Sequence, residues 1–384
     1  MKHLFSILTL VILTLNFGCN TKSKSKNTES STTEVKANTK GTALLTPRLL
    51  LNLPETFNSP ASGDLDSEGN VIFTSPNLHN EVLIKAGFMQ KPAIPTIGKI
   101  DKNNTLSTWY TFKPEDMDVK SGTVVPFGLD FGPDGNTYVI DMQLWAGGDS
   151  RIIKITVENG EVAKLETVVT GLSFPNGLVW KGNDLFISDT VLGETEDGKQ
   201  ISGVYKVNID ELNADKPLVI SKFVNLESKD AHLFETFISS GVLKFGANGI
   251  TIAGDGNLYT GIMEDGSVFK TTMDADNNKI ATSEFTKGMI ATDGLKWDAR
   301  SNKFYITDLF ANAVYSIDMK GNLELLAENG NTDDADGKLD GPGEVIIRGN
   351  EAIVLNFDAA FGAPNMVNTT PDAPYTISVL DLKE

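Results

Sequence analysis

A pattern that recurs six times along this 384-residue chain constrains its fold more than any other feature. Each copy has a small or polar residue, usually followed by Gly, then an apolar alternation, a turn rich in Gly, Asn and Asp, and a β-rich run. The copies are ASGDLDSEGNVIFTSP from Ala61, PFGLDFGPDGNTYVIDM from Pro126, PNGLVWKGNDLFISDT from Pro175, ANGITIAGDGNLYTGI from Ala247, TDGLKWDARSNKFYITD from Thr292 and PGEVIIRGNEAIVLNFD from Pro342. Each copy predicts two short strands joined by a tight turn.

A second hairpin follows most copies, so each unit has about four strands. Residues 47–384 divide into six units of about 56 residues each, against about 40–50 for a typical propeller blade, and loops supply the difference. We therefore predict an all-β, six-bladed β-propeller over residues 47–384. A two-sheet sandwich is the competing all-β architecture, but it explains the six-fold repeat poorly.

The ends of the predicted domain suggest how the ring closes. The segment RLLLNLPE (48–55) has no partner of its own, and PYTISVLDLKE (374–384) ends the chain with a good strand. Pairing the two in one blade would remove exposed sheet edges. The longest insert, 208–246, contains AHLFETFISSGVLKF, which we interpret as a short helix or a lid.

The N-terminal segment MKHLFSILTLVILTLNFGC has the order of a secretory signal: a basic residue, an apolar run too short to span a bilayer comfortably, and a small residue before the cleavage site. Gly18-Cys19 resembles the lipobox of bacterial lipoproteins, although Asn16 departs from it. The resemblance implies a signal peptide over 1–18, diacylation of Cys19, and an exported, membrane-anchored protein on the periplasmic or cell-surface side. A plain secretory signal is the alternative.

Residues 19–46 are rich in Ser, Thr, Asn and Lys, which predicts a flexible tether. The chain carries a formal charge of −18, of which the tether contributes +3 and Lys2 +1, so residues 47–384 carry −22. This charge disfavours nucleic acid and anionic lipid as ligands and favours cations. The membrane contact expected is therefore the lipid anchor alone, and we expect a monomer. Cys19 is the only cysteine, which leaves the folded domain without a disulfide or a thiolate zinc site.

The residue before each repeated Gly-apolar pair should face one mouth of the propeller channel. These residues are Ala61, Phe127, Asn176, Asn248, Asp293 and Gly343. Three of them are polar and fall on consecutive units, three to five. Their side-chain oxygens would converge as hard cations such as Ca²⁺ require. Asn and Asp before Gly are also selected by tight turns, so a purely structural role is the alternative.

The segments PNGLVWKGNDLFISDT, ANGITIAGDGNLYTG and TDGLKWD resemble the senescence-marker-protein, gluconolactonase and luciferin-regenerating-enzyme family of six-bladed propellers. The resemblance covers about residues 48–384. It implies one divalent cation in the channel, held by a Glu of the first blade, Asn of the third and fourth, and Asp of the fifth. It also implies hydrolysis of sugar or other lactones.

Transferred by blade order, the ligands implied are Asn176, Asn248 and Asp293. Ala61 stands where the first-blade Glu belongs. Glu344 of the adjoining sixth blade is our leading replacement, and Asp64 is the second candidate. Calcium is the expected ion.

Lactone hydrolysis needs a Lewis acid, an attacking water and a base, and Asp293 could serve as both ligand and base. We therefore predict a divalent-cation-dependent hydrolase of a lactone or related small ester. The alternative is a non-catalytic propeller that binds a small molecule or a protein at the same mouth, which Ala61 and Phe127 favour. A strictosidine-synthase-like protein is a third possibility.

Three further features need an interpretation. His79 and His232 are too few for a Ser-His-Asp arrangement to be expected, and His232 is interpreted as an exposed loop residue or one at the pocket entrance. The acidic stretch NTDDADGKLDG (331–341) lacks EF-hand spacing, so we interpret it as a solvated loop between blades. An Asp or Asn ends the second strand of four units, which favours a structural role in binding loop backbone.

Overall fold

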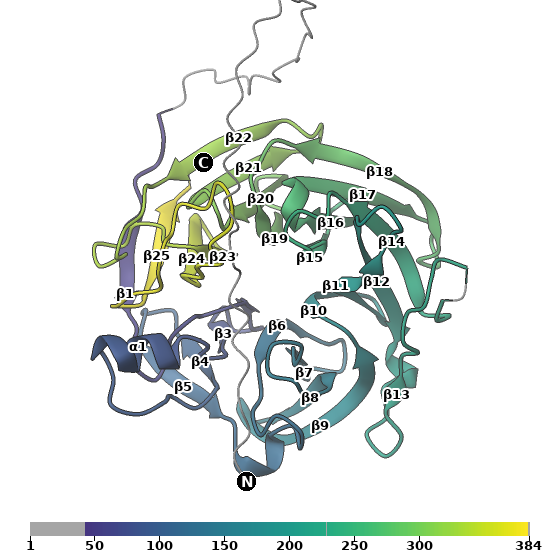
Figure 1. The fold of residues 1–384 in the computed structure, drawn as a ribbon, viewed down its shortest axis with the longest axis horizontal. Coiled ribbons are helices and arrows are strands. Elements are labelled where there is room, and N and C mark those ends of the chain that lie inside the picture. Colours follow the sequence, from purple (N-terminus) through teal and green to yellow (C-terminus); the bar gives the residue numbers. More distant parts are fainter. Residues whose placement is uncertain (1–42, 228, 383–384) are drawn as a thin grey trace, which may run out of the picture. The chain divides into compact units, whose positions relative to one another are not determined.

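The repeat forms six antiparallel sheets arranged around a central channel in the computed structural model (Figure 1). The structure describes residues 43–227 and 229–382, which lie in one compact unit. Each innermost strand contacts the innermost strands of the two neighbouring sheets, and the sixth contacts the first, so the ring is closed. The six-bladed β-propeller expected from the sequence is confirmed.

Blade 1 carries a short α-helix and a 3-10 turn, and blade 2 has a fifth strand. Blade 1 consists of β2 (Gly63–Leu65), β3 (Val71–Ser75), β4 (Thr96–Ile100) and β5 (Leu106–Thr111), with α1 (Asn80–Ala86) after β3 and η1 (Pro114–Asp116) after β5. Blade 2 consists of β6 (Pro126–Phe131), β7 (Thr137–Asp141), β8 (Ser150–Glu158), β9 (Glu161–Leu172) and the short β13 (Leu218–Val219), which pairs in parallel with β9.

Blade 3 contains a long connection before its outermost strand, and a short connection leads from that strand to blade 4. Blade 3 consists of β10 (Pro175–Lys181), β11 (Asp184–Glu194), β12 (Gln200–Asn208) and β14 (Leu233–Ser239), with η2 (Ile209–Glu211) after β12. Blade 4 consists of β15 (Ala247–Ile252), β16 (Leu258–Ile262), β17 (Ser267–Met273) and β18 (Lys279–Lys287), with η3 (Met263–Asp265) after β16.

Blade 6 contains both ends of the domain. Blade 5 consists of β19 (Thr292–Asp298), β20 (Lys303–Asp308), β21 (Ala313–Asp318) and β22 (Leu323–Glu328). Blade 6 consists of β23 (Pro342–Arg348), β24 (Glu351–Asn356), β25 (Thr376–Asp381) and β1 (Arg48–Asn52). The antiparallel pairing of β1 with β25 confirms the closure predicted from the two chain ends.

The predicted helix or lid in the 208–246 insert is wrong. Residues of AHLFETFISSGVLKF form β14, the outermost strand of blade 3, where LFETFIS alternates buried and less buried positions. This period of two is that of a strand with one face on the core. The segment that contains Val219 forms β13, which pairs with β9 of blade 2.

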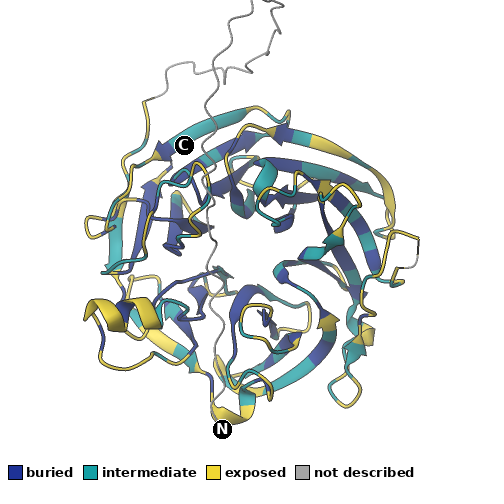
Figure 2. Cartoon of the chain, viewed as in Figure 1, coloured by how far each residue is buried: buried dark blue, intermediate teal, exposed yellow. Residues whose placement is uncertain are grey.

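The hydrophobic core lies between the blades. Buried apolar side chains of the described residues form six clusters. Five of them join the facing surfaces of two neighbouring blades, and the largest fills the space between blades 2 and 3 and extends to residues of the other four blades. Figure 2 shows the inner strands as mostly buried and the outer strands as more exposed. Within residues 43–227 and 229–382, no helix is long and apolar enough to cross a membrane.

The repeated glycine lets the inner strands approach closely. A Cβ at Gly128, Gly177 or Gly249 would press against the carbonyl oxygen of the next blade's mouth residue, Asn176, Asn248 or Asp293. Only a residue without a side chain fits there. In blades 1 and 6 this position is filled by Ser62 and Glu344 instead, and these two side chains hydrogen-bond to each other.

Candidate functional site

A pocket of about 430 Å³ lies where the inner strands begin, and we call it the mouth pocket. Its polar side chains are Asn176 at the start of β10, Asn248 at the start of β15, Asp293 at the start of β19, and Thr190. The structure therefore brings Asn176, Asn248 and Asp293 together, from three consecutive blades. Whether they hold a metal stays a prediction, because no ion is part of the structure.

Buried aspartates at the ends of second strands hold the backbone just before two of these residues, Asp293 and Asn176. In blade 5, the Asp308 carboxylate at the end of β20 accepts hydrogen bonds from the backbone N–H of Ile290 (2.6 Å) and Ala291 (3.0 Å), just before Asp293. In blade 3, Asp189 accepts from Ser173 N (2.8 Å) and Phe174 N (2.7 Å), just before Asn176. Backbone N–H groups at such buried corners need an acceptor.

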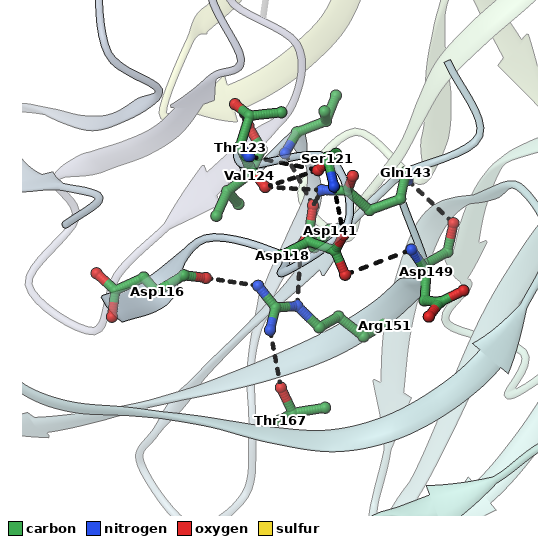
Figure 3. A network of polar contacts seen from close by, with 12 residues as sticks. Asp116, Asp118, Ser121, Thr123, Val124, Asp141, Gln143, Asp149, Arg151 and Thr167 are labelled. Atoms are coloured by element: carbon green, nitrogen blue, oxygen red, sulfur yellow. Dashed lines mark hydrogen bonds and ion pairs between the residues drawn. The ribbon is translucent and has the colours of Figure 1, made fainter. Parts of the chain in front are cut away.

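Blades 2 and 6 have the same corner. Asp141 Oδ1 accepts from Val125 N at 2.8 Å, and Asn356 Oδ1 accepts from Asp340 N at 3.1 Å. Asp141 is also held by Arg151, whose guanidinium reaches the Asp116 carbonyl oxygen and Thr167 Oγ1 (Figure 3). The structural role inferred from the recurring strand-end Asp or Asn is confirmed.

The donor atoms at the mouth are free to bind a cation. Among the residues described, the Asn176 side chain has no hydrogen-bond partner, and the Asp293 carboxylate has only Asn248. Asn248 is 2% exposed, and its Nδ2 donates to Met263 Sδ (3.4 Å). One carboxylate and two amides, all hard oxygen donors with vacant lone pairs, fit a calcium-type ion.

Burial raises the pKa of Asp293 well above its usual range, and the nearby Glu344 carboxylate adds to this effect. A carboxyl whose pKa is raised in this way is a stronger base in its ionised form than an exposed aspartate, which suits it to general acid or base catalysis. A bound cation at the mouth would oppose this shift, because it favours the carboxylate form.

Glu344 lies one layer deeper than the mouth residues, in the position that glycine occupies in four other blades. It lines a second pocket of about 370 Å³, the channel pocket, which Ala61, Asn176, Asn248 and Asp293 also line from above. Its Oε2 accepts from Ser62 Oγ (2.9 Å) and its Oε1 from its neighbour's backbone, Val345 N (3.0 Å). Burial raises the pKa of Glu344, and Lys296 opposes that shift. Its role as a ligand stays a prediction.

A cluster of charges deeper in the channel was missed from the sequence. Lys296 Nζ binds Asp64 Oδ2 at 2.8 Å, so Asp64, the second candidate replacement ligand, is held by this lysine. Burial, together with the Asp64 carboxylate, raises the pKa of Asp130 to about 7. Although burial alone would lower it, the pKa of Lys296 is raised, because Asp64, Glu344 and Asp130 lie near it. The signal was present: Asp64, Asp130 and Lys296 all stand three residues after the mouth position.

Aromatic side chains form the wall of the mouth pocket. They are Phe127, Trp145, Phe174, Phe245, Phe357 and Phe361. Successive ring centroids, from Phe127 through Trp145, Phe174 and Phe245 to Phe361, are 5.1–6.0 Å apart. Most of these residues come from loops outside the repeat, so the repeat does not predict where they lie. A partial signal existed, because the residue after three of the four strand-end Asp or Asn residues (Thr190, Leu309 and Phe357) lines the pocket.

The two histidines lie outside the mouth pocket. His232 is held by Asp230 (2.8 Å) and Glu211 (3.0 Å), at the outer edge of blade 3. His79 Nδ1 lies 2.6 Å from Tyr375 Oη, and burial lowers the pKa of His79 to about 4. Cys19, the predicted signal peptide and nearly all of the predicted tether lie outside the described residues.

A second group of acids, two of them buried and one half-buried, lies in blade 6. Asp340, Asp358 and Asp372 each offer a carboxylate oxygen within 4.8 Å of the others, an arrangement able to hold a metal ion. Asp334 and Asp340 are each 2% exposed. The interpretation of residues 331–341 as a solvated loop is therefore wrong for these two aspartates, which fold inward beneath β25.

No protein-family model matches the chain, and no curated protein matches it in sequence. Among solved structures, it is similar to a luciferin-regenerating enzyme (TM-score 0.54, 10% identity, 88% of this chain and 95% of that one). It is also similar to a structural-genomics protein assigned as a gluconolactonase (TM-score 0.52, 14% identity, 88% of this chain and 94% of that one). A third similar structure is the PQQ-bound aldose sugar dehydrogenase of Streptomyces coelicolor (TM-score 0.52, 13% identity, 88% of this chain and 98% of that one). At such identities the likeness establishes the fold alone, and the propeller fold expected from the resemblance is the one these proteins share with this chain.

Proposed function

We propose that this protein is a divalent-cation-dependent hydrolase of a lactone or a related small ester, with its site in the mouth pocket. One observation carries the proposal: three consecutive blades each place an oxygen-bearing side chain, Asn176, Asn248 or Asp293, at one pocket, and these side chains have few hydrogen-bond partners. Gluconolactonase-like and luciferin-regenerating proteins among the structural neighbours are consistent with it but show only the fold.

Asn176, Asn248 and Asp293 would hold the ion, and calcium is the ion we propose. When bound there, the cation would supply Lewis acidity toward a substrate carbonyl. Glu344 would add negative charge from one position deeper in the channel. It would replace the carboxylate that is missing in blade 1, where Ala61 stands in place of the implied Glu. Its Ser62 and Val345 contacts fix the carboxylate beside the channel, so it can support the ion's charge even where it makes no direct bond.

Asp293 is the residue we propose as the base. It can accept the proton of an attacking water and return it to the alcohol that leaves when the ester bond breaks. Burial raises the pKa of this carboxyl, and a higher pKa makes its carboxylate form a stronger base toward the water.

The wall of the pocket indicates the substrate class. When a substrate binds, the six aromatic side chains would bury its apolar surface and exclude water from Asn176, Asn248 and Asp293. We therefore propose a lactone or ester with an apolar ring or acyl chain rather than a polyhydroxylated sugar, which would need more hydrogen-bonding groups than this wall provides.

A second candidate function is non-catalytic binding of a small molecule or a protein at the same mouth. Ala61 and the apolar wall favour it, since a binding pocket needs neither a base nor a metal. The two candidates differ in turnover, so they can be separated directly.

The test is calcium titration calorimetry on the full chain, with hydrolysis of a panel of apolar lactones followed in parallel. We expect Asp293→Ala to bind one ion fewer than wild type and to lose hydrolysis, and chelation of wild type to abolish hydrolysis. Asp276→Ala, an exposed aspartate in a turn, is the matched control and should match wild type. Equal ion counts in wild type and Asp293→Ala would overturn the metal site, and ion binding without turnover would favour the binding module.

We also propose that the protein is an exported lipoprotein, monomeric and attached to a membrane only through Cys19. Expression in a bacterial host with a labelled fatty acid tests this. Label should enter the wild-type protein and not Cys19→Ala, whereas a secreted, unlabelled wild type would indicate a plain signal peptide.

A further inference from the structure

We propose that Asp340, Asp358 and Asp372 form a second divalent-cation site, taking calcium, which clamps the loop that builds one wall of the mouth pocket. Their carboxylate oxygens lie within 4.8 Å of one another. The site is separate from Asn176, Asn248 and Asp293, and it does not depend on the proposed hydrolase function.

The three acids converge from distant parts of blade 6. Asp340 lies just before β23, Asp358 lies two residues after β24, and Asp372 lies four residues before β25. The connection from 357 to 375 contains no helix or strand. Loops of this length without secondary structure are uncommon and need another source of order. A single ion bound to all three acids would fix both ends of this loop to the start of the inner strand.

An unpartnered buried atom points to a missing ligand. Asp340 is 2% exposed, and its Oδ1 has no hydrogen-bond partner within the described part of the chain. Asp334, next to this group and also 2% exposed, has an unpartnered Oδ1 as well. Buried polar atoms almost always have a hydrogen-bond partner, and a bound ion or water is a recognised partner for one that has none within the protein.

The cluster lacks a compensating positive charge. Among the described residues, none of Asp334, Asp340, Asp358 and Asp372 forms an ion pair with a lysine or an arginine. Burial and the neighbouring carboxylates raise the pKa of Asp358 to about 9 and that of Asp334 to about 8. Several buried like charges are unfavourable unless protons or a cation neutralise them.

Neighbouring groups already orient the proposed ligands. Asn368 Nδ2 donates to Asp358 Oδ1 (3.3 Å), and the backbone N–H of Asp372 donates to Asp358 Oδ2 (2.8 Å). Asn312 Nδ2 in turn holds Asn368 Oδ1 at 2.6 Å. Hydrogen bonds of this kind orient the ligands of metal sites. All the donors are oxygens, which favours Ca²⁺ over Zn²⁺, and waters would complete its usual six to eight ligands.

The clamp connects to function through the loop itself. Phe357 and Phe361 flank Asp358 in the chain, and both line the mouth pocket. An ion on Asp358 would therefore hold these two rings in the wall.

The test uses the full chain carrying Asp293→Ala, so that the proposed mouth site is absent. We expect calorimetry to show one remaining calcium ion, and Asp340→Asn in this background to weaken its binding at least tenfold. Asp336→Asn, an exposed acid in the same stretch, is the matched control and should leave binding unchanged. Calcium at about 100-fold above its Kd should raise the Tm of the Asp293→Ala protein by about 4 °C.

A crossover keeps the test informative about folding. Without calcium, Asp340→Asn removes one of the crowded charges and should melt at or above the temperature of its parent; with calcium, the parent should melt higher. Calcium should also slow proteolysis within 357–375 in the parent and not in Asp340→Asn. Equal calcium affinity in parent and Asp340→Asn, or no calcium bound by Asp293→Ala, would overturn the second site. Equal affinity in parent and Asp340→Asn would not bear on the mouth site, because that site is tested by the difference in bound calcium between wild type and Asp293→Ala.

Discussion

Replacing Asp308 with Ala should destabilise the propeller and disturb the mouth more than any exposed substitution. The Asp308 side chain is fully buried and accepts hydrogen bonds from Ile290 N (2.6 Å), Ala291 N (3.0 Å) and Ala311 N (3.1 Å). These bonds fix the chain immediately before Asp293. Alanine would leave the three N–H groups without an acceptor.

The size of the effect follows from the surroundings of those three groups. Ile290 is 40% exposed, so water can satisfy its N–H, whereas Ala291 is 0% exposed. Each N–H left buried and unsatisfied costs about 1–3 kcal/mol. Two such groups give about 2–6 kcal/mol. Burial raises the pKa of Asp308, so its carboxylate carries a cost of its own that its removal relieves. We therefore expect the lower part of the range, about 2–4 kcal/mol, a large share of the about 5–15 kcal/mol typical of a folded domain.

Urea unfolding followed by tryptophan fluorescence measures this loss. Asp308→Asn keeps the Oδ1 acceptor for two of the three N–H groups, as Asn356 does naturally in blade 6, and should cost less than Asp308→Ala. Asp276→Ala, at an exposed turn, should stay within about 0.5 kcal/mol of wild type. Should Asp308→Ala unfold at the wild-type urea midpoint, or Asp308→Asn be as damaging as Ala, the proposed role of the corner is refuted.

Three other predictions concern the channel, a histidine and the wall. Lys296→Met leaves Asp64, Asp130 and Glu344 without their cation and should lower the free energy of unfolding by about 3–5 kcal/mol at pH 7.5. Because the pKa of Asp130 is about 7, this loss of stability should be smaller at pH 5. An equal loss at both pH values in urea unfolding would contradict the interaction of Lys296 with these carboxylates. The pKa of His79 is about 4 in the folded protein, below its unfolded value of about 6.5, so between these pH values the unfolded chain binds one more proton. The free energy of unfolding of wild type should therefore fall by up to about 3 kcal/mol between pH 7 and pH 4. His79→Gln should flatten this pH dependence, and a variant whose urea midpoint varies with pH as in wild type would contradict the role of His79. Trp145→Ala should raise KM for an apolar lactone about tenfold with a smaller change in kcat, since the ring contributes ground-state binding to the wall; an unchanged KM would exclude the wall from the substrate site.

The blades were predictable because their signals are local. The Gly-containing turns between β-rich runs, such as Asp134-Gly135-Asn136, fix each hairpin from neighbouring residues alone, and the alternation fixes which face is buried. The convergence of Asn176, Asn248 and Asp293 followed, because equivalent positions of a repeat meet at the same point of the ring.

What the sequence could not predict depends on contacts outside the repeat. β14 was misinterpreted because its partner is found only after an irregular excursion of the chain from β12. The wall residues Trp145, Phe245 and Phe361 sit in loops that differ from blade to blade, so no register relates them. The burial of Asp334 and Asp340 depends on the return of β25 over an acidic loop, and an isolated acidic stretch is usually solvated.

The central claim is that a divalent cation binds at the mouth of the channel. A crystal structure of the full chain at saturating calcium, with anomalous scattering used to identify the ion, tests it most directly. We predict a calcium ion in the mouth pocket with oxygens of Asp293, Asn176 and Asn248 at about 2.3–2.6 Å. A mouth pocket that holds only water, with these three side chains well ordered at saturating calcium, would contradict the account.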